Sequence, residues 1–539
     1  MPLSLVYRQF SLKRCCRYIS ITLLIAWAFG LQASSTEETL YIGNSGEPGT
    51  LDPHRYNLRL EETLLNDLFM GLTTFGAQGQ IVPGAATSWT VSEDGLTWTF
   101  NLRKDLRWSD GTPLTADDFV YSLRRLMNPQ TAASLAYFMY MLDNAEAVNQ
   151  GKLPVTDLGV YSQGPHTLVM QLAAPYPFLP ERLLYPTAFP VPQHVIDKVG
   201  AAWTKPEHWV SNGAYTLAHW QPEAYIEMHG NPHFVDSVSI QRARYLPFAN
   251  EQAAYNRYRN GELHAIASFP ANELARVEKN HAASLRQAPL LSMMYLVFNT
   301  RRPPFDDVRV RTALASVVDQ NLLADKVLRS GARAAKTFTP EMITAYQAPP
   351  MDHSHTPSDL IERAKRLLAE AGYDAKRPLR ITLRHVSGNE EKRVNLAVAG
   401  MWRQLGVQTQ LQQGTMNAHF ADLRQGDFDV AWAGWIGESN AEHYLGLLAS
   451  DVGDVNYGAY HSAEFDQLIQ QARTHADVQS RNNFLQQAEA VALREAPVVP
   501  LYSLASRRLV NPRLGGWYDN PRDIHPLRYL HFATDQPSP

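Results

Sequence analysis

Cysteine is almost absent from this chain. Its 539 residues contain two, Cys15 and Cys16, and both lie near the N-terminus. The chain also lacks the Gly-x-Ser-x-Gly sequence of serine hydrolases, the His-Glu-x-x-His of zinc proteases and the Gly-rich Lys-Ser/Thr loop that holds phosphates. These absences remove the common hydrolase and nucleotide sites, so we expect a protein that is not an enzyme and that holds no cofactor.

Histidine offers little support for a metal site. The tightest pair, His353 and His355, lies in a proline-flanked stretch before a predicted helix. Protein zinc sites use three or four ligands, and two histidines on a loop supply only part of such a set. We interpret the pair as a solvated loop, and an adventitious metal site is the alternative.

Long apolar runs are scarce as well, and the most prominent one lies at the N-terminus. It spans Ile19 to Leu31, follows four basic residues and leads into Gln32-Ala-Ser-Ser35. This order is typical of a secretory signal peptide. A retained membrane anchor fits less well, because a span needs ~20 apolar residues. We expect residues 1–35 to be removed and the mature protein to lie in the periplasm, without a lipid anchor because no cysteine follows.

Neither charge sign is in large excess. The chain has 49 Lys and Arg against 53 Asp and Glu, and loss of the four basic residues in the signal would leave 45 against 53. An acidic mature chain gives no reason to expect a nucleic acid partner. Low-complexity tracts and internal repeats are also missing, and 539 residues exceed what one core usually supports, so we expect two or three domains.

The patterned parts of the sequence alternate between strands and helices. Leu379, Ile381 and Leu383 alternate as a strand, Val407–Leu411 reads as another, and a helix is predicted around 397–405 between them. Such a unit favours a parallel pair with a right-handed crossover. Further helices are predicted over 61–72, from Phe305 onward, and over 356–371. These patterns therefore predict an α/β protein.

The most informative stretch runs from Pro83 to Phe119. Leu96, Trp98, Phe100 and Leu102 alternate with polar residues, as in a half-buried strand. Turn residues follow in Asp110-Gly-Thr-Pro113, and then Thr115 begins a predicted helix with Asp118 in the place of a capping acid. A strand, a tight turn and a capped helix are expected in this order.

The particular residues of this stretch are more specific than its pattern. Trp98-Thr-Phe-Asn-Leu-Arg103 and Trp108-Ser-Asp-Gly-Thr-Pro113 resemble the signature of the peptide and nickel solute-binding proteins of ABC importers, and most of all periplasmic oligopeptide-binding proteins. The likeness continues in order over nearly the whole mature chain. It implies a two-lobed periplasmic binding protein of type II (Venus flytrap), with an inserted domain and a hinge. It also implies the division into lobe I (36–70, 190–290 and 506–539), inserted domain II (71–189) and lobe III (291–505).

The resemblance also implies a function. A monomeric protein of this kind captures an oligopeptide between its lobes and delivers it to membrane permease subunits, whose associated ATPase subunits hydrolyse ATP. One alternative is the same type of protein with another ligand: a murein peptide, an opine-like conjugate, or a nickel or haem complex. A secreted hydrolase and a structural or chaperone-like envelope protein are the alternatives from other classes.

The segment from Phe428 to Asn440 is the strongest candidate for a binding site. Phe428–Trp432 reads as a strand, and Gly434 and Gly437 flank Trp435 where the backbone must approach another group closely. The resemblance implies main-chain hydrogen bonds to a peptide from Gly434, Trp435 and Ile436. It also implies that the Glu438 carboxylate pairs with the peptide's free amino group. A helix-terminal or surface acid is the alternative for Glu438.

Other positions follow from the same resemblance. Asn57 and Arg59 match a segment that contributes from lobe I, and Tyr502 and Tyr295 match aromatic residues near the cleft, or else belong to the core. Trp432 replaces an arginine that suits a short peptide's carboxylate, and the stretch 387–393, read as a loop, lacks the histidine of relatives. Lys392, Arg393 and Arg424 can only be suggested as substitutes. The candidate ligand-binding residues are Glu438, Gly434, Trp435, Ile436, Asn57, Arg59, Trp432, Tyr502 and Arg424.

Overall fold

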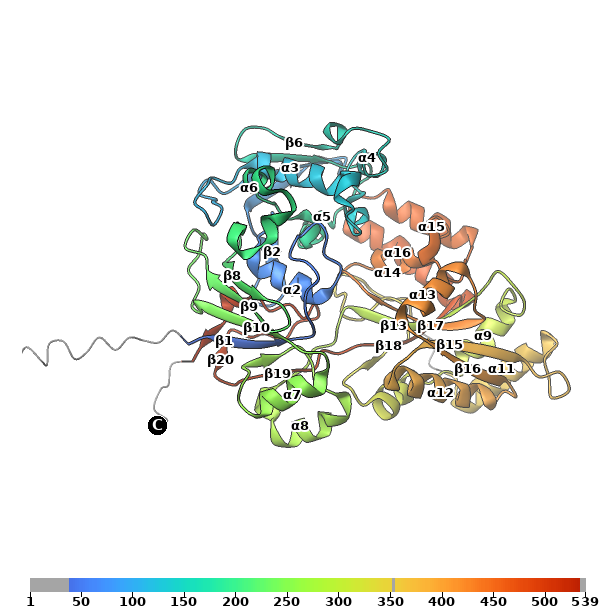
Figure 1. Cartoon of the computed structure of the whole chain (residues 1–539). Helices are drawn as coiled ribbons and strands as arrows, with labels where there is room; N and C mark the ends of the chain where they lie inside the picture. The colour runs from blue at the N-terminus through green and yellow to red at the C-terminus, as the bar shows by residue number, and fades with distance from the viewer. Residues whose placement is uncertain (1–37, 351–353, 534–539) are drawn as a thin grey trace, which may run out of the picture. The chain divides into compact units, whose positions relative to one another are not determined.

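The computed structural model describes residues 38–350 and 354–533 (Figure 1). The expected signal peptide, both cysteines and His353 lie outside these residues. From Thr39 onward the chain forms one unit by its internal contacts. Within the described residues, no helix combines the length and the apolar character that crossing a membrane requires. We keep the names lobe I, domain II and lobe III for the segments given above, whose exact boundaries remain a proposal.

The sheet of lobe I joins segments that are far apart in the sequence. Its order is β12-β19-β11-β1-β10-β9-β8, and β1 is parallel to both β10 and β11. In Figure 1 the blue β1 accordingly lies beside the green β10. The bounds are β1 Leu40–Asn44, β8 Tyr215–Gln221, β9 Tyr225–Gly230, β10 Arg242–Pro247, β11 Ala265–Ile266, β12 Leu285–Arg286 and β19 Arg508–Val510.

The sheet of lobe III has the order β14-β18-β13-β17-β15-β16. Its central strand β13 (Ser292–Phe298) is buried at every position. Successive side chains of a strand point to opposite faces, and Tyr295 and Val297 lie in one apolar cluster while Leu296 and Phe298 lie in another. The other bounds are β14 Arg333–Ala334, β15 Arg380–Val386, β16 Gln408–Gly414, β17 Val430–Ile436 and β18 Val498–Ser503.

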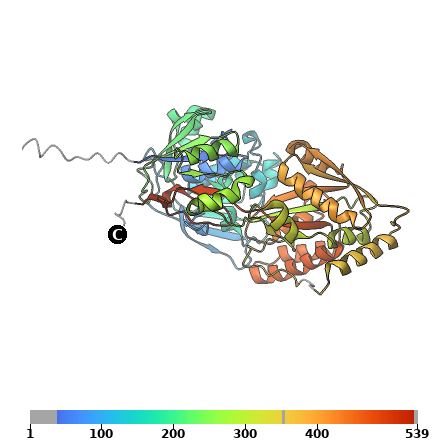
Figure 2. The same ribbon diagram turned by 90° about the horizontal axis from the view of Figure 1, so that it is seen from below.

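Helices cover both faces of this sheet. The helices α9 (Val308–Ser316), α11 (Pro357–Glu370) and α12 (Asn389–Arg403) contribute to one cluster, and α15 (Ala463–Arg473) and α16 (Val478–Glu495) contribute to the other. The predicted strand-helix-strand unit is confirmed, because α12 connects the parallel strands β15 and β16. Figure 2 shows these yellow to red segments of lobe III gathered together.

Domain II carries the third sheet, in the order β4-β5-β7-β6. The predicted strand and capped helix are confirmed as β5 (Thr97–Leu102) and α3 (Ala116–Met127). The Thr115 N–H donates to Asp118 Oδ2 over 2.8 Å, as a capping box requires. The other bounds are β4 Ala86–Val91, β6 Val160–Ser162 and β7 Thr167–Gln171. Side chains of this domain and of lobe I belong to one continuous apolar cluster.

Some predicted boundaries were wrong. The helix predicted over 61–72 is α2 (Arg59–Leu68), which ends earlier because Phe69 has an extended backbone and the Met70 N–H donates to Asn212 Oδ1 at 3.1 Å rather than to the preceding turn. The stretch 387–393, read as a loop, contains the first turn of α12. Acidic residues in that turn interact favourably with the positive end of the helix, a signal that the loop interpretation passed over.

The chain crosses between lobe I and lobe III twice, at 287–291 and 504–507. These two segments pair with each other: Pro289 and Ala505 form an antiparallel bridge, and the Leu290 N–H donates to the Leu504 carbonyl over 2.8 Å.

The remaining strands and α-helices are short: β2 Thr73–Phe75, β3 Ile81–Pro83, β20 Leu514–Gly515, β21 His531–Phe532, α4 Ala145–Asn149, α5 Leu179–Arg182, α6 Gln193–Val199, α7 Glu251–Arg259, α8 Leu274–Asn280, α10 Gln320–Leu322, α13 Met416–Gln425 and α14 Glu442–Leu445.

Candidate functional site

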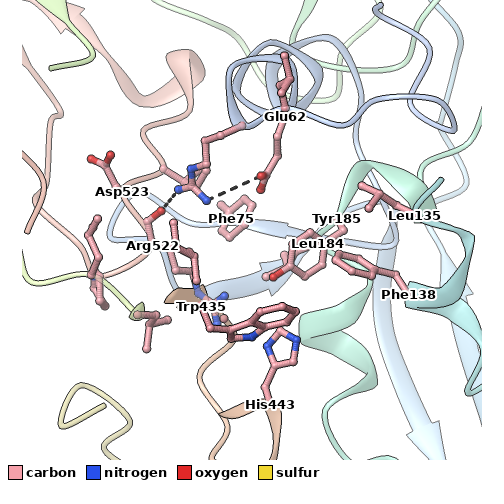
Figure 3. Close-up of a pocket in the computed structure, with 18 of the residues that line it drawn as sticks. Glu62, Phe75, Leu135, Phe138, Leu184, Tyr185, Trp435, His443, Arg522 and Asp523 are labelled. Carbon is pink, nitrogen blue, oxygen red and sulfur yellow. Dashed lines mark hydrogen bonds and ion pairs between the residues drawn. The ribbon is translucent and has the colours of Figure 1, made fainter. Parts of the chain in front are cut away.

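A cavity of about 270 Å³ is enclosed by residues from lobe I, domain II and lobe III (Figure 3). Its wall is formed by the start of α2, the residues after α5, the end of β17, the crossing segment 287–291 and the C-terminal segment 521–524. Most of the lining is apolar, and aromatic rings are prominent in it. The apolar lining residues are Tyr56, Leu58, Phe75, Leu135, Phe138, Leu184, Tyr185, Leu290, Leu291, Trp435, Ile436 and Ile524.

The structure brings four of the predicted residues to this cavity. Asn57 and Arg59 line it from lobe I, and Trp435 and Ile436 line it from the end of β17. The Trp435 ring lies edge-on to His443, with 5.6 Å between ring centroids, as Figure 3 shows. Gly434 precedes Trp435 in β17 and is half-buried.

The other predicted residues lie elsewhere. Trp432 and Tyr502 are buried in the apolar cluster that α9, α11 and α12 cover, and Tyr295 is buried in the opposite cluster. Arg424 lies exposed in the last turn of α13. Lys392 and Arg393 are exposed on α12, and none of these six residues lines the cavity.

The end of β17 offers an unpaired sheet edge. On one side, β13 pairs with all seven residues of β17, but on the other side β15 pairs only with Val430 and Ala431. Strand pairing among the described residues therefore leaves that side of 432–436 open. The Gly437 N–H donates to Leu291 O, so the alternation of an antiparallel ladder turns the N–H and C=O groups of Gly434 and Ile436 outward. His419 Nε2 lies 2.7 Å from the Trp432 carbonyl, which is the next outward group.

Glu438 follows this edge, but its carboxylate is fully buried and does not line the cavity. Its Oε1 lies 2.9 Å from Nε of Arg182, the last residue of α5. Its Oε2 accepts hydrogen bonds from Asn440 Nδ2 at 3.0 Å and from the Tyr176 hydroxyl at 3.3 Å. The carboxylate is thus paired within the protein, with a guanidinium from domain II.

Electrostatics around this pair agree with a charged guanidinium. Burial alone would lower the pKa of Arg182, but the Glu438 carboxylate raises it above its ordinary value. Burial, together with the nearby Arg182 charge, lowers the pKa of His443 to about 3, so this histidine is neutral and its Nδ1 accepts from the Glu438 N–H at 2.8 Å.

Glu181, the residue before Arg182, binds the segment that follows β17 at Ser439. Glu181 accepts hydrogen bonds from the Ser439 N–H at 2.6 Å and from its hydroxyl, and it forms an ion pair with Arg522. The pKa of Arg522 is raised, because attraction to Glu181 outweighs the effect of burial. Two adjacent side chains of α5 therefore fix residues 438 and 439 after β17.

The charged groups on the cavity wall also have partners. Arg522 pairs with Glu181, and Asp523 Oδ2 lies 2.9 Å from Arg508 Nη2. Arg59 has the loosest arrangement: its nearest contact with Glu62 is 3.8 Å, and its side chain is 44% exposed. A second guanidinium nitrogen of Arg59 donates to the backbone carbonyl of Arg522.

Sequence reasoning missed Glu181, Arg182 and Arg522. Arg182 and Glu438 are far apart in the chain, and the four residues Leu-Pro-Glu-Arg of α5 carry no periodic pattern that would reveal which face is buried. The only available signal was indirect: a carboxylate placed after a strand of the core needs a buried cation if no ligand supplies one.

Comparison with known proteins gives a consistent result. The model of the family described as bacterial extracellular solute-binding proteins, family 5 Middle, matches residues 80–454. The probable deoxycholate-binding periplasmic protein YgiS of Escherichia coli is 37% identical, over 92% of this chain and 94% of its own. The periplasmic murein peptide-binding protein MppA of the same organism is 33% identical, and the match covers 96% of this chain and 98% of MppA.

Solved structures agree. The unliganded open form of the murein tripeptide-binding protein MppA matches with a TM-score of 0.82 at 34% identity, over 92% of this chain and 98% of its own. Haemophilus influenzae OppA, solved in complex with RPPGFSPFR, matches with a TM-score of 0.76 at 31% identity. This match covers 93% of this chain and 99% of the OppA chain. The expected two-lobed α/β fold is confirmed, and this chain belongs to the bacterial extracellular solute-binding proteins of family 5.

Proposed function

We propose that this protein captures a peptide in the cavity between its lobes and delivers it to the membrane subunits of an ABC importer in the bacterial envelope. It acts in the periplasm as a monomer, and its partner subunits supply the ATP hydrolysis. The open edge of β17, on the wall of that cavity, is the observation that carries the proposal.

A peptide ligand is itself a strand, and it can extend a sheet by pairing with a free edge. The outward N–H and C=O groups of Gly434 and Ile436 supply such an edge. Main-chain pairing ignores the ligand's side chains, which then lie against apolar and aromatic walls. The relative from Haemophilus influenzae was solved with a peptide, and the murein peptide-binding relative is named for one. Asn57 and Arg59 would contact the ligand from the opposite side.

An apolar carboxylic acid is a second candidate ligand. The mostly apolar lining of the cavity and the half-exposed Arg59 favour it. The relative YgiS is named as a probable deoxycholate-binding protein. Such a ligand would use the rings of Phe138, Tyr185 and Trp435 more than the edge of β17.

Pairing of a peptide with the open edge of β17 can be tested by removing one outward N–H of that strand. Proline at position 436 lacks that group, whereas Ile436→Val keeps it and serves as the matched control. Loss of one hydrogen bond in a largely dry site costs about 1–3 kcal/mol, so peptide affinity should fall roughly 5- to 150-fold in Ile436→Pro and change little in Ile436→Val. Calorimetric titration of ligand-free protein with a small panel of peptides measures both. Equal peptide affinity in the two variants would show that β17 does not pair with the ligand.

A further inference from the structure

The buried pair of Arg182 and Glu438 bears on what the ligand carries. A carboxylate after β17 would suit a ligand's ammonium group if it were unpaired. Here the guanidinium of Arg182 already lies against it, with Nε 2.9 Å from Oε1, and both side chains are at most 10% exposed. The protein supplies its own cation to this carboxylate.

The guanidinium is held by aromatic rings as well as by the Glu438 carboxylate. Its central carbon lies 5.0 Å from the centroid of the Phe138 ring and 5.9 Å from those of Tyr176 and Tyr185. The Tyr176 hydroxyl is also within 3.1 Å of Arg182 Nη2. Phe138 and Tyr185 line the cavity, as Figure 3 shows, so the positive charge is fixed directly behind the wall. Three aromatic faces and a carboxylate hold the cation in place.

An ammonium group entering this part of the cavity would gain little. The Glu438 carboxylate is already neutralised by Arg182, and a second cation beside this guanidinium is repelled while it loses its own water. The other acids at the cavity also have cations beside them: Glu181 pairs with Arg522, Asp523 with Arg508, and Glu62, which lines the cavity, lies 3.8 Å from Arg59. Among the charged side chains that line the cavity, Arg59 is the most exposed and has the longest ion pair, at 3.8 Å, and it also donates to the backbone carbonyl of Arg522.

We propose that Arg182 takes the place of a ligand's ammonium group, so that the cavity selects apolar solutes that carry a carboxylate and no free amine. The ligand's carboxylate meets Arg59. This inference rests on the proposed function and specifies the ligand at the same site. An amino-terminally blocked peptide and a steroid-type or fatty acid share this chemistry.

Three probes separate the possibilities in calorimetric titrations of ligand-free protein: an apolar tripeptide, its N-acetyl form, and deoxycholate. The N-acetyl peptide, or deoxycholate, should bind at least about tenfold more tightly than the free-amino peptide. Binding of the acetylated peptide identifies a blocked peptide as the source, and binding of deoxycholate alone identifies a non-peptide acid. A free-amino peptide that binds as tightly as its acetylated form overturns this inference but leaves peptide capture standing. Failure of all three probes to bind overturns both.

Variants test the role of Arg182 itself. Arg182→Gln leaves the Glu438 carboxylate without a cation, so the free-amino peptide should gain about tenfold relative to the acetylated one. The double variant Arg182→Gln/Glu438→Gln removes both charges and should show no such gain. Arg403→Gln, on the exposed face of α12, is the control. A folded Arg182→Gln protein with an unchanged ratio contradicts the proposal. If Arg182→Gln does not fold, the wild-type comparison of the two peptides still decides.

Discussion

Asp67 is a buried acid whose ionisation should make the stability of this protein depend on pH. It lies in α2 with 2% exposure, where Oδ1 accepts from the Leu527 N–H at 2.8 Å and Oδ2 from the Tyr245 hydroxyl at 3.1 Å. Burial raises its pKa from 3.8 to about 7, although these two donors act in the opposite direction. Asparagine has nearly the same shape and no charge: its Oδ1 can accept from the Leu527 N–H, and its Nδ2 can donate to the Tyr245 hydroxyl oxygen.

The direction in which stability changes with pH follows from the direction of the pKa shift of Asp67. A folded-state pKa above the unfolded value means that the folded protein binds the proton more tightly. The stabilisation is complete below pH 4 and is lost as the pH rises through about 7. A shift of about three units corresponds to about 4 kcal/mol in all, of which about 2–3 kcal/mol is lost between roughly pH 5 and pH 8.

Guanidinium-induced unfolding at several pH values measures this effect. Other groups titrate as well, so the informative quantity is the difference between Asp67→Asn and the wild type. That difference should grow in favour of Asp67→Asn from pH 5 to pH 8, and the variant should be the more stable protein at pH 8. Asp236→Asn, at an exposed position, is the matched control substitution. A difference for Asp67→Asn that does not change with pH would refute the reasoning.

Two further predictions concern backbone packing and export. A Cβ on Gly213 would lie 2.3 Å from the backbone carbonyl carbon of Leu68, so Gly213→Ala should destabilise the protein by about 1–3 kcal/mol or more. Gly400→Ala meets nothing within 4 Å on α12 and should be neutral or stabilising, which thermal melting of both variants can check. N-terminal sequencing of the exported protein should find a start between Gly30 and Glu37, and a protein that begins at Met1 would contradict the expected signal peptide.

Local signals predicted the local structure well. The strand of Trp98 and Phe100 and the helix after Thr115 follow from a two-residue period and a capping box, and both are short-range features. The end of β17 was harder. The strand was predicted over Phe428–Trp432, yet it continues through Gly434 to Ile436, because β13 pairs with it along its whole length. Strand formation there is decided by a neighbour that is distant in sequence.

The candidate site was predictable only in part, for the same reason. The segment after Phe428 was located, and Trp435 and Ile436 lie on the cavity wall. The partner of Glu438 could not be found, because Arg182 comes from a four-residue helix in another domain. A resemblance assigns a role to a position, whereas the neighbours of that position decide whether its charge is available to a ligand.

The pairing of the two crossing segments has a mechanical consequence. A single flexible linker would let the lobes swing, slide and rotate in any direction. Here 287–291 and 504–507 are joined to each other by backbone hydrogen bonds and cannot slide apart without breaking them. Motions that shear one segment past the other are therefore opposed by these bonds, whereas bending of both segments together keeps them intact. A ligand that holds the lobes in one arrangement then has fewer motions to suppress than it would with a single linker.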